Sequence, residues 1–572
     1  MLKLPYRPDH RHIIRRVIVR GTLVLDTPTC LGTGDTDSPT DMPLSGDNLE
    51  RNKALLTGSS IAGALRNYLR ERNKGYGKSD RRIDIAAKLF GDLFAYEDEK
   101  SLSEKHKIRL RENDTQSSLI IDDAISAKPI QSELRDGVKI NSITRTAVDK
   151  AKYDLELLQG GTEFPLCFEL LIEKDSNERE LRKGLAIALS GLEQGEISLG
   201  MKKRRGFGRC HVKEWQVWHF NLEDPGDRMA WLKFEHWHTA LFSELPSYSS
   251  IKDAFTQANI NKVDFDELER EDQRDRFTIN ATFTLASPLL IRSGQAETGR
   301  APDVVHLKSA RIINEVKYFL ASCLRQQMFS QAIAWLNLLP QEITVWTSEN
   351  LELFLLAYFL LQPSRSKLPI LSGTSLAGVL RHRAERIVKT LQCSFNQNPE
   401  CDQEPEIIKS IFGHVENKRS QASRLIVREA EIEEYEELVQ TRIAIDRFTG
   451  GAYHGALFQE QPVFANDETE LKLEIELRNP DQHEIGLLLL LLKDLWTEDL
   501  PVGGSSSVGR GRLQGKEATL VWLKEGKSWT ISQPDLKENY LEITGSDRQD
   551  LENYVNRLVE YAQQETTKND QA

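Results

Sequence analysis

The chain has few cysteines and no long apolar stretch. The six cysteines in its 572 residues are scattered without the spacing of a disulfide framework, which favours a reducing cytoplasm as its localisation. The longest apolar run, residues 485–492, ends at Lys493. It is far shorter than the ~20 residues of a spanning helix, so it predicts a buried helix, and no membrane partner is expected. Residues 1–20 are polar and basic, which argues against a signal peptide.

The sequence also lacks the motifs of common enzyme classes. No Gly-x-x-x-x-Gly-Lys-Ser/Thr occurs, no Gly-x-Gly-x-x-Gly opens a helix, and neither His-Glu-x-x-His nor an ordered Ser/His/Asp set is present. ATP, NAD and peptidase chemistry are therefore disfavoured. Cys393 and Cys401 lie near His382 and His414, but their spacing fits no standard zinc pattern. Whether these cysteines bind a metal is left open.

What the sequence does contain is a repeat. Residues 56–66 read LTGSSIAGALR, and residues 371–381 read LSGTSLAGVLR. Two more pairs follow in the same order, and a weaker echo lies between the first pair and the second. These pairs are 139–144 with 444–449, 200–209 with 503–512, and the echo 119–124 with 425–430. Collinear matches of this kind predict two fused copies of one domain.

Length and composition agree with two soluble domains. A chain of 572 residues is too long for one core, and its 39% hydrophobic content suffices for two. The predicted boundaries are 1–220 for the first domain, 221–276 for an acidic linker region, 277–530 for the second domain with a helical insertion at about 310–366, and 531–572 for a C-terminal helix and tail.

The repeated blocks suit the binding of a polyanion, although the net charge is −12. Each helix that begins at Gly58 or Gly373 offers backbone N–H groups, hydroxyls and a following arginine, which together can hold an anion. The loop at 204–209 combines glycines, which let the backbone approach phosphate, with arginines that supply charge. A plain capped core helix is the alternative interpretation of either helix start.

These motifs together resemble the RAMP superfamily of CRISPR proteins. More narrowly, the chain resembles a tandem fusion of two backbone subunits of a type III effector complex, over about 15–215 and 277–525. The resemblance implies an α+β chain with a ferredoxin-like, RRM-type fold in each half and inserted thumb hairpins within 125–155 and 430–458. It also implies three kinds of partner, namely a guide CRISPR RNA, a target RNA and other subunits of the complex.

The resemblance further implies an aspartate that cuts target RNA, in a loop before the Gly-Ser-Ser helix. Asp37, in an Asp-Ser-Pro sequence, matches this pattern. The second copy departs from it, because Asp303 lies in Ala-Pro-Asp-Val-Val, so the activity of that copy stays open. Mg²⁺ is the expected cofactor, although a carboxylate can also accept a proton directly. The implied RNA contacts are Gly58, Ser59, Ser60, Arg66, Lys203, Arg204, Arg205, Gly206, Phe207, Arg209, Gly373, Thr374, Ser375, Arg381, Arg447, Arg510 and Arg512.

Two other functions compete with target cleavage. One is a scaffold that only orders guide and target RNA while other subunits cut. The other is a guide-processing endonuclease, which would be expected to carry a catalytic histidine near the first helix. No histidine lies between His12 and His106, which disfavours the endonuclease. The sequence leaves open the position of the chain in a complex and the identity of its neighbours.

Overall fold

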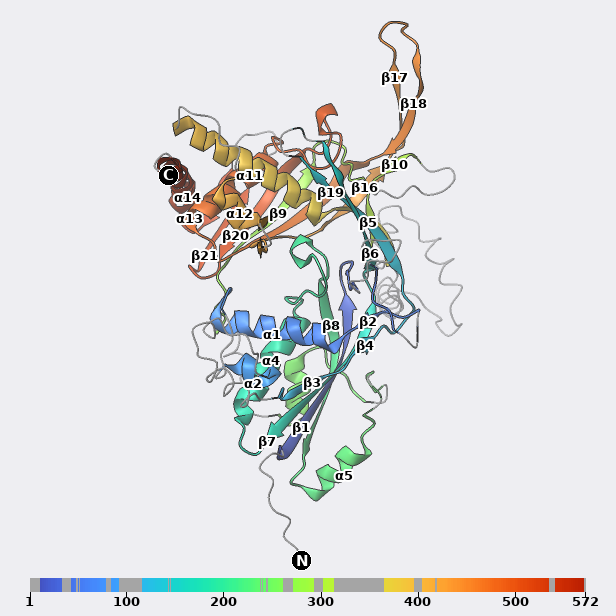
Figure 1. Ribbon diagram of the computed structural model, residues 1–572, viewed down its shortest axis with the longest axis vertical. Coiled ribbons are helices and arrows are strands. Elements are labelled where there is room, and N and C mark those ends of the chain that lie inside the picture. The colour runs from blue at the N-terminus through green and yellow to red at the C-terminus, as the bar shows by residue number, and fades with distance from the viewer. Residues whose placement is uncertain are drawn as a thin grey trace, which may run out of the picture.

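A computed structural model describes most of the chain as two α+β domains that follow one another along the long axis (Figure 1). The first domain lies at the N-terminal end and the second at the other end. The described residues are 11–32, 43–47, 50, 52–78, 84–91, 116–141, 144, 146–236, 238, 240–242, 245–260, 271–292, 302–312, 365–395, 404–416, 419–533 and 541–569. Asp37 and residues 313–364 of the expected insertion lie outside them.

The first domain is built on a four-stranded antiparallel sheet in the order β3-β7-β1-β8. Because helices follow its first and third strands in chain order, the sheet has the ferredoxin-like βαββαβ arrangement. Its main strand β1 is buried on both faces, because helices cover one face and an aromatic segment around Phe234 covers the other. The elements are β1 (Ile13–Leu25), α1 (Gly58–Lys74), α2 (Ile85–Phe90), β3 (Leu119–Ile121), β7 (Glu163–Glu173), α4 (Glu178–Glu193) and β8 (Cys210–Asn221), with the short pair β2 (Leu55–Leu56) and β4 (Ala124–Ile125).

The second domain repeats this topology in the order β15-β19-β9-β20 and has its own hydrophobic core. Further strands extend its sheet at both edges. The repeated elements are β9 (Arg276–Leu285), α11 (Gly373–Phe395), α12 (Glu406–Phe412), β15 (Leu425–Val427), β19 (Val463–Arg478), α13 (Gln482–Trp496) and β20 (Leu513–Trp522). The further strands are β11 (Lys308–Ile312), β12 (Arg365–Leu371), β16 (Ala430–Glu437), β21 (Lys527–Ser532) and β22 (Glu542–Gly545), while β13 (His414–Glu416) and β14 (Arg419–Gln421) form a separate two-stranded sheet.

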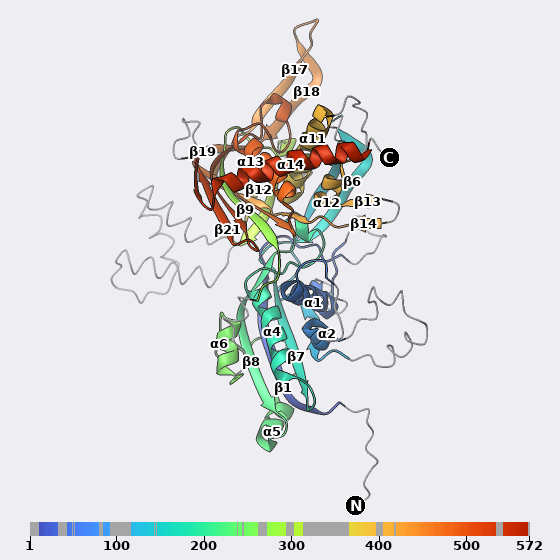
Figure 2. The same ribbon diagram turned by 90° about the vertical axis from the view of Figure 1, so that its left-hand side faces the viewer.

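Each domain carries a β-hairpin at the position expected for a thumb. The first pairs β5 (Ser132–Ile140) with β6 (Ala147–Leu158), and the second pairs β17 (Gln440–Ile445) with β18 (Ala452–Gln461). The first thumb runs along the second domain, whereas the second thumb projects away from the molecule (Figures 1 and 2). A short strand, β10 (Val304–Val305), pairs in parallel with the base of β18.

Two expectations about the boundaries need correction, and most of a third, the helical insertion, lies outside the described residues. Much of 221–260 is folded onto the first domain, because α5 (Pro225–Lys233) contacts β8 and α6 (Ile251–Gln257) buries Phe255 in the first core. The expected insertion at 310–366 begins and ends as paired strands. The second domain continues past 530, since α14 (Arg548–Asn569) packs on α13. The run at 485–492 does form a buried helix, and no helix among the described residues is long and apolar enough to cross a membrane.

Candidate nucleic-acid interface

The two glycine loops are structural duplicates. Each contains one turn of 3₁₀ helix, η2 (Lys203–Arg205) in the first domain and η3 (Ser506–Val508) in the second. The N–H of Gly208 donates to Pro28 O at 3.0 Å, and the N–H of Gly511 donates to Pro288 O at 2.9 Å. A Cβ atom on either glycine would lie 1.8 Å from a carbonyl oxygen. The backbone geometry of this turn therefore requires the glycines of the repeated motif, before any role in binding is considered.

The first glycine loop does not face solvent but docks on the second domain. A Cβ atom on Gly206 would lie 2.4 Å from Glu429 N, and one on Gly373 would lie 2.4 Å from Arg205 O. Arg204 also donates to the Ser423 carbonyl oxygen. We call this contact the domain seam. It unites the first glycine loop with the second helix start, two sites that the sequence assigned to different copies.

The domain seam gathers positive charge, and one of its cations has an unpaired nitrogen. Among the described residues, Nη1 of Arg205 is buried without a hydrogen-bond partner. Burial, followed by the charges of Arg381 and Arg204, lowers the pKa of Arg205 below its ordinary value. Thr374 and Ser375, at the start of α11, are half-buried in the same region, and Lys203 is exposed. We call Lys203, Arg204, Arg205, Thr374 and Ser375 the seam cradle.

A buried ion-pair network holds the first thumb on the second domain. Glu429 accepts from Arg135 at 2.9 Å and from Arg311 at 2.7 Å, and its side chain is 0% exposed. Glu133 pairs with Arg135 at 2.8 Å and accepts from Ser309 at 3.1 Å. Sequence reasoning missed this network. The available signal was two opposite charges at positions 133 and 135, which lie on one face of a strand.

Several of the expected RNA contacts are committed to other groups. Nη1 of Arg66 donates to Gly91 O, and Nη1 of Arg381 donates to Gly413 O, each at 3.0 Å. Arg209 pairs across the domains with Glu474 at 3.5 Å.

Of the other expected RNA contacts, Phe207 and Arg510 are buried, whereas Arg447 and Arg512 face solvent. Phe207 is 3% exposed and packs against Leu155 and Leu157, so its ring does not face solvent. Arg510 is also 3% exposed and pairs with Glu460 at 2.9 Å. Arg447 and Arg512 are exposed.

The first helix start is open, in contrast to the second. Ser59 and Ser60 are exposed. Two of the N–H groups at this helix end already have protein partners, because Gly58 N donates to Asp123 at 2.6 Å and Ser60 N donates to Thr57 at 3.3 Å. Because these two donors are occupied, fewer backbone N–H groups can hold an anion here than the sequence predicts.

Asp303 is exposed at the base of the second thumb, where it accepts from Gln459 N at 2.8 Å. Its loop is anchored by His306, which is 3% exposed, accepts from Ile291 N at 3.1 Å and donates to Ile370 O at 3.0 Å. Burial lowers the pKa of His306 to about 4, so the imidazole is neutral at physiological pH.

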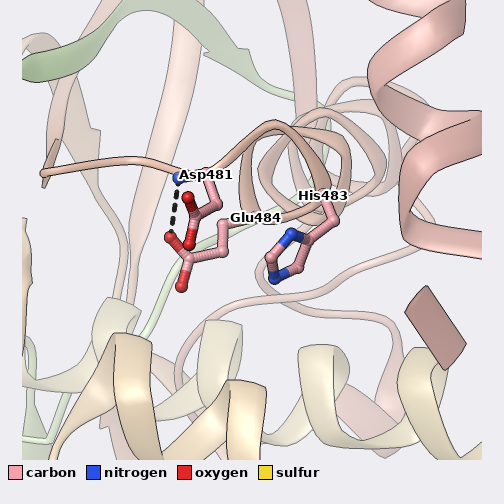
Figure 3. Close-up of side chains that lie close together, drawn as sticks. All are labelled: Asp481, His483 and Glu484. Carbon is pink, nitrogen blue, oxygen red and sulfur yellow. Dashed lines mark hydrogen bonds between the residues drawn. The ribbon is translucent and has the colours of Figure 1, made fainter. Parts of the chain in front are cut away.

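One other cluster could suggest a metal site. Asp481, His483 and Glu484 place possible ligand atoms within 4.8 Å of one another (Figure 3). Each has a structural role instead. Glu484 accepts from Asp481 N at 3.0 Å in the capping box of α13 and also pairs with Arg424. The ring of His483 stacks on the ring of Tyr561, with 4.2 Å between the two ring centroids. Cys393 is exposed. Because Cys401 lies outside the described residues, whether the two cysteines bind a metal stays untested.

Comparison with known proteins yields one result. The RAMP superfamily matches residues 22–211 and 282–514, which correspond to the two repeated domains. No curated protein matches the chain. The family match spans most of the sequence and falls on both copies of the ferredoxin-like fold. The chain therefore belongs to the RAMP superfamily and carries the domain of that family twice.

Proposed function

We propose that the chain is a double backbone subunit of a type III CRISPR ribonucleoprotein, which binds guide RNA and cleaves the paired target RNA at two places. RAMP proteins act in RNA-binding complexes of several subunits, and some of them cleave RNA. Beyond that family role, we propose that the bound RNA is a guide CRISPR RNA, that a target RNA pairs with it, and that the chain cleaves this target.

The observation that carries the proposal is the seam cradle. It combines cations that crowd one another, an arginine nitrogen with no partner among the described residues, and the start of a helix longer than twenty residues. A phosphate group would supply an acceptor for the unpaired nitrogen of Arg205 and negative charge beside Arg204 and Arg205. A chain of phosphates could then continue from the seam cradle toward the two thumbs, whose exposed tips include Arg447.

Cleavage is assigned to Asp37 and Asp303. RNA can be cut by its own 2′-OH, so the protein has only to hold an in-line geometry and assist the transfer of a proton. Asp303 suits this role because its carboxylate is exposed, while the backbone N–H of Gln459 fixes its orientation. The exposed oxygen could accept a proton from a ribose placed beside the second thumb.

Mg²⁺ is proposed as a cofactor of the same loops. Within the described part of the chain, Asp303 belongs to no group of three potential metal ligands. Mg²⁺ often takes one or two carboxylates and completes its shell with water and substrate phosphates, so one exposed carboxylate such as that of Asp303 could hold it. When bound, Mg²⁺ would stabilise negative charge on a phosphoryl oxygen.

A second candidate function is the non-catalytic scaffold. The sequence around Asp303 favours it for the second copy, because Ala-Pro-Asp-Val-Val departs from the Asp-Ser-Pro pattern of the first copy. In that case the chain would position guide and target while another subunit cuts.

Target cleavage by the reconstituted complex separates the two functions. With end-labelled target RNA, Asp37→Ala should erase one product and leave the other, and Asp303→Asn should do the converse. Asparagine keeps an oxygen that can accept from Gln459 N but loses the charge. Asp467→Asn is the matched control, because Asp467 is an exposed aspartate of the same domain. A double variant that binds target and still produces both products would favour the scaffold.

A further inference from the structure

A buried ion pair joins the second thumb to the second glycine loop. Nη1 of Arg510 lies 2.9 Å from Oε2 of Glu460 on β18, and Nη2 of Arg510 donates to Oε1 of Gln440 on β17 at 2.6 Å. Arg510 and Glu460 are 3% and 2% exposed, and Gln440 faces Glu460 in the pairing of β17 with β18. One arginine of the loop therefore contacts both strands of the thumb at its base. We call Arg510, Glu460 and Gln440 the thumb pin.

The first domain makes the same contact with an aromatic ring. Phe207 occupies the position of Arg510 in the repeated motif, and it packs against Leu155 of β6. The guanidinium of Arg135, on the paired strand β5, lies 5.6 Å from the centroid of the Phe207 ring. Arg135 and Leu155 face each other in the pairing of β5 with β6. In both domains, one residue of the glycine loop thus touches one residue on each thumb strand.

The backbone pairing also makes Leu155 and Glu460 equivalent. The residue that follows the turn proline is bridged to Leu158 in the first domain and to Val463 in the second. Leu155 and Glu460 each lie three residues before that bridge. The same buried position at the thumb base therefore holds a leucine in one copy and a glutamate in the other.

The charged contact is more exacting than the apolar one. Oε2 of Glu460 also lies 3.1 Å from Nε of Arg442, so two cations share one carboxylate oxygen. Among the described residues, neither this oxygen nor Nη1 of Arg510 has a hydrogen-bond partner, so the attraction is between charges. Removal of one partner leaves a buried charge without compensation, whereas replacement of both by apolar groups is often neutral.

The thumb pin lies beside the loop that carries Asp303. Oδ2 of Asp303 accepts from Gln459 N at 2.8 Å, and the residue after Asp303, Val304, pairs in parallel with Glu460. The carboxylate of Asp303 is therefore held by the strand residue that directly precedes Glu460. A shift of β18 at Glu460 would move the N–H of Gln459 and, with it, the carboxylate of Asp303.

We propose that Arg510 is a positioning residue for Asp303, and that the thumb pin fixes the geometry of the second cleavage loop. This role differs from the RNA contact that the sequence implied, because the guanidinium of Arg510 is buried. The proposal rests on the cleavage part of the proposed function. There the first glycine loop contacts RNA phosphate, whereas the second holds the thumb and the neighbouring carboxylate in one orientation.

Single-turnover cleavage by the reconstituted complex tests the proposal with variants that copy the first domain. Arg510→Phe and Glu460→Leu each break the ion pair, and each should slow formation of the product assigned to Asp303 by roughly ten- to a hundredfold. Affinity for target RNA and the product assigned to Asp37 should not change. The double variant carries the apolar contact of the first copy, so it should restore most of the lost rate.

The control applies the same substitution to an exposed arginine of the second domain. Arg557→Phe, on α14, should leave both products at the wild-type rate. Wild-type formation of the second product in both single variants would overturn the proposal. So would an equal loss of both products, or a double variant that is as slow as the slower single variant, because a general loss of stability would explain either result.

Hydrogen exchange of the free chain distinguishes a failure of this proposal from a failure of the proposed function. The amides of β10 and β18, including that of Gln459, should exchange several-fold faster in each single variant and return to the wild-type rate in the double variant. The amides of the first thumb should not change. Unchanged exchange in both single variants would overturn the proposal. A wild-type complex without a second product would refute cleavage by this copy, and the exchange rates would still decide whether the thumb pin holds the Asp303 loop.

Discussion

At the scale of single residues, two arginines of the repeated motif have equivalent structural roles. Arg66 and Arg381 each donate to the carbonyl of a glycine that ends the following short helix. Arg381 also makes two hydrogen bonds of 2.8 Å with Glu404. The arginine of the motif therefore joins two helices within its own domain.

Replacement of Arg381 should accordingly destabilise the second domain. Arg381→Ala removes charge-assisted hydrogen bonds to Gly413 O and Glu404, and the expected loss in the free energy of unfolding is about 1–3 kcal/mol. Thermal unfolding measures it. Arg386→Ala is the matched control, because Arg386 lies on the same helix and is exposed. Equal stability of the two variants would refute the structural role of Arg381.

At the scale of elements, the loop that carries Asp303 is held by one buried imidazole. His306 binds the backbone at Ile291 and at Ile370, and thereby links the Asp303 loop to β12. The neutral form makes both bonds, since one ring nitrogen accepts and the other donates. The position of the proposed cleavage loop is thus coupled to the protonation of His306.

This coupling predicts a pH dependence. The pKa of His306 falls from 6.5 to about 4 on folding, so the unfolded chain takes up the proton first as the pH drops. The contribution of the neutral His306 to the free energy of unfolding is fully present above pH 6.5 and is lost as the pH falls toward 4. It amounts to roughly 3 kcal/mol. His306→Gln keeps a donor and an acceptor but does not titrate. Its stability should fall less steeply than that of the wild type across this window, and parallel curves would contradict the assignment.

Elements were predicted well where local chemistry determines them. The helix starts at Gly58 and Gly373 and the buried run at 485–492 follow from capping, periodicity or the repeat itself, whereas the thumb positions follow from the resemblance to RAMP proteins. The packing of 221–260 onto the first domain was not predicted, because the polar and acidic residues around Ile251 and Phe255 obscure the apolar pattern by which these two residues anchor α6 in the first core. Two buried apolar residues in a polar stretch give little periodic signal.

At the scale of the whole molecule, the candidate site is a product of the contact between copies. The sequence identified Arg205 and Gly373 separately, yet nothing in it indicated that a loop of one copy would cover the helix start of the other. Tertiary contact between distant segments has no local signal. For the same reason the buried positions of Phe207 and Arg510 were not foreseen, although both lie inside correctly identified motifs.

If RNA phosphate occupies the seam cradle, the salt dependence of guide RNA binding by the full chain should depend on Arg205, and this measurement tests the proposed function most directly. Arg205→Glu should fold, because the new carboxylate gains Arg204 and Arg381 as neighbours. It should bind guide RNA more weakly, with a slope of log K against log salt that is shallower by about 0.7 for each phosphate that the variant no longer neutralises. Arg557→Glu, on the exposed face of α14, should change neither. Wild-type affinity and slope in Arg205→Glu would contradict the account.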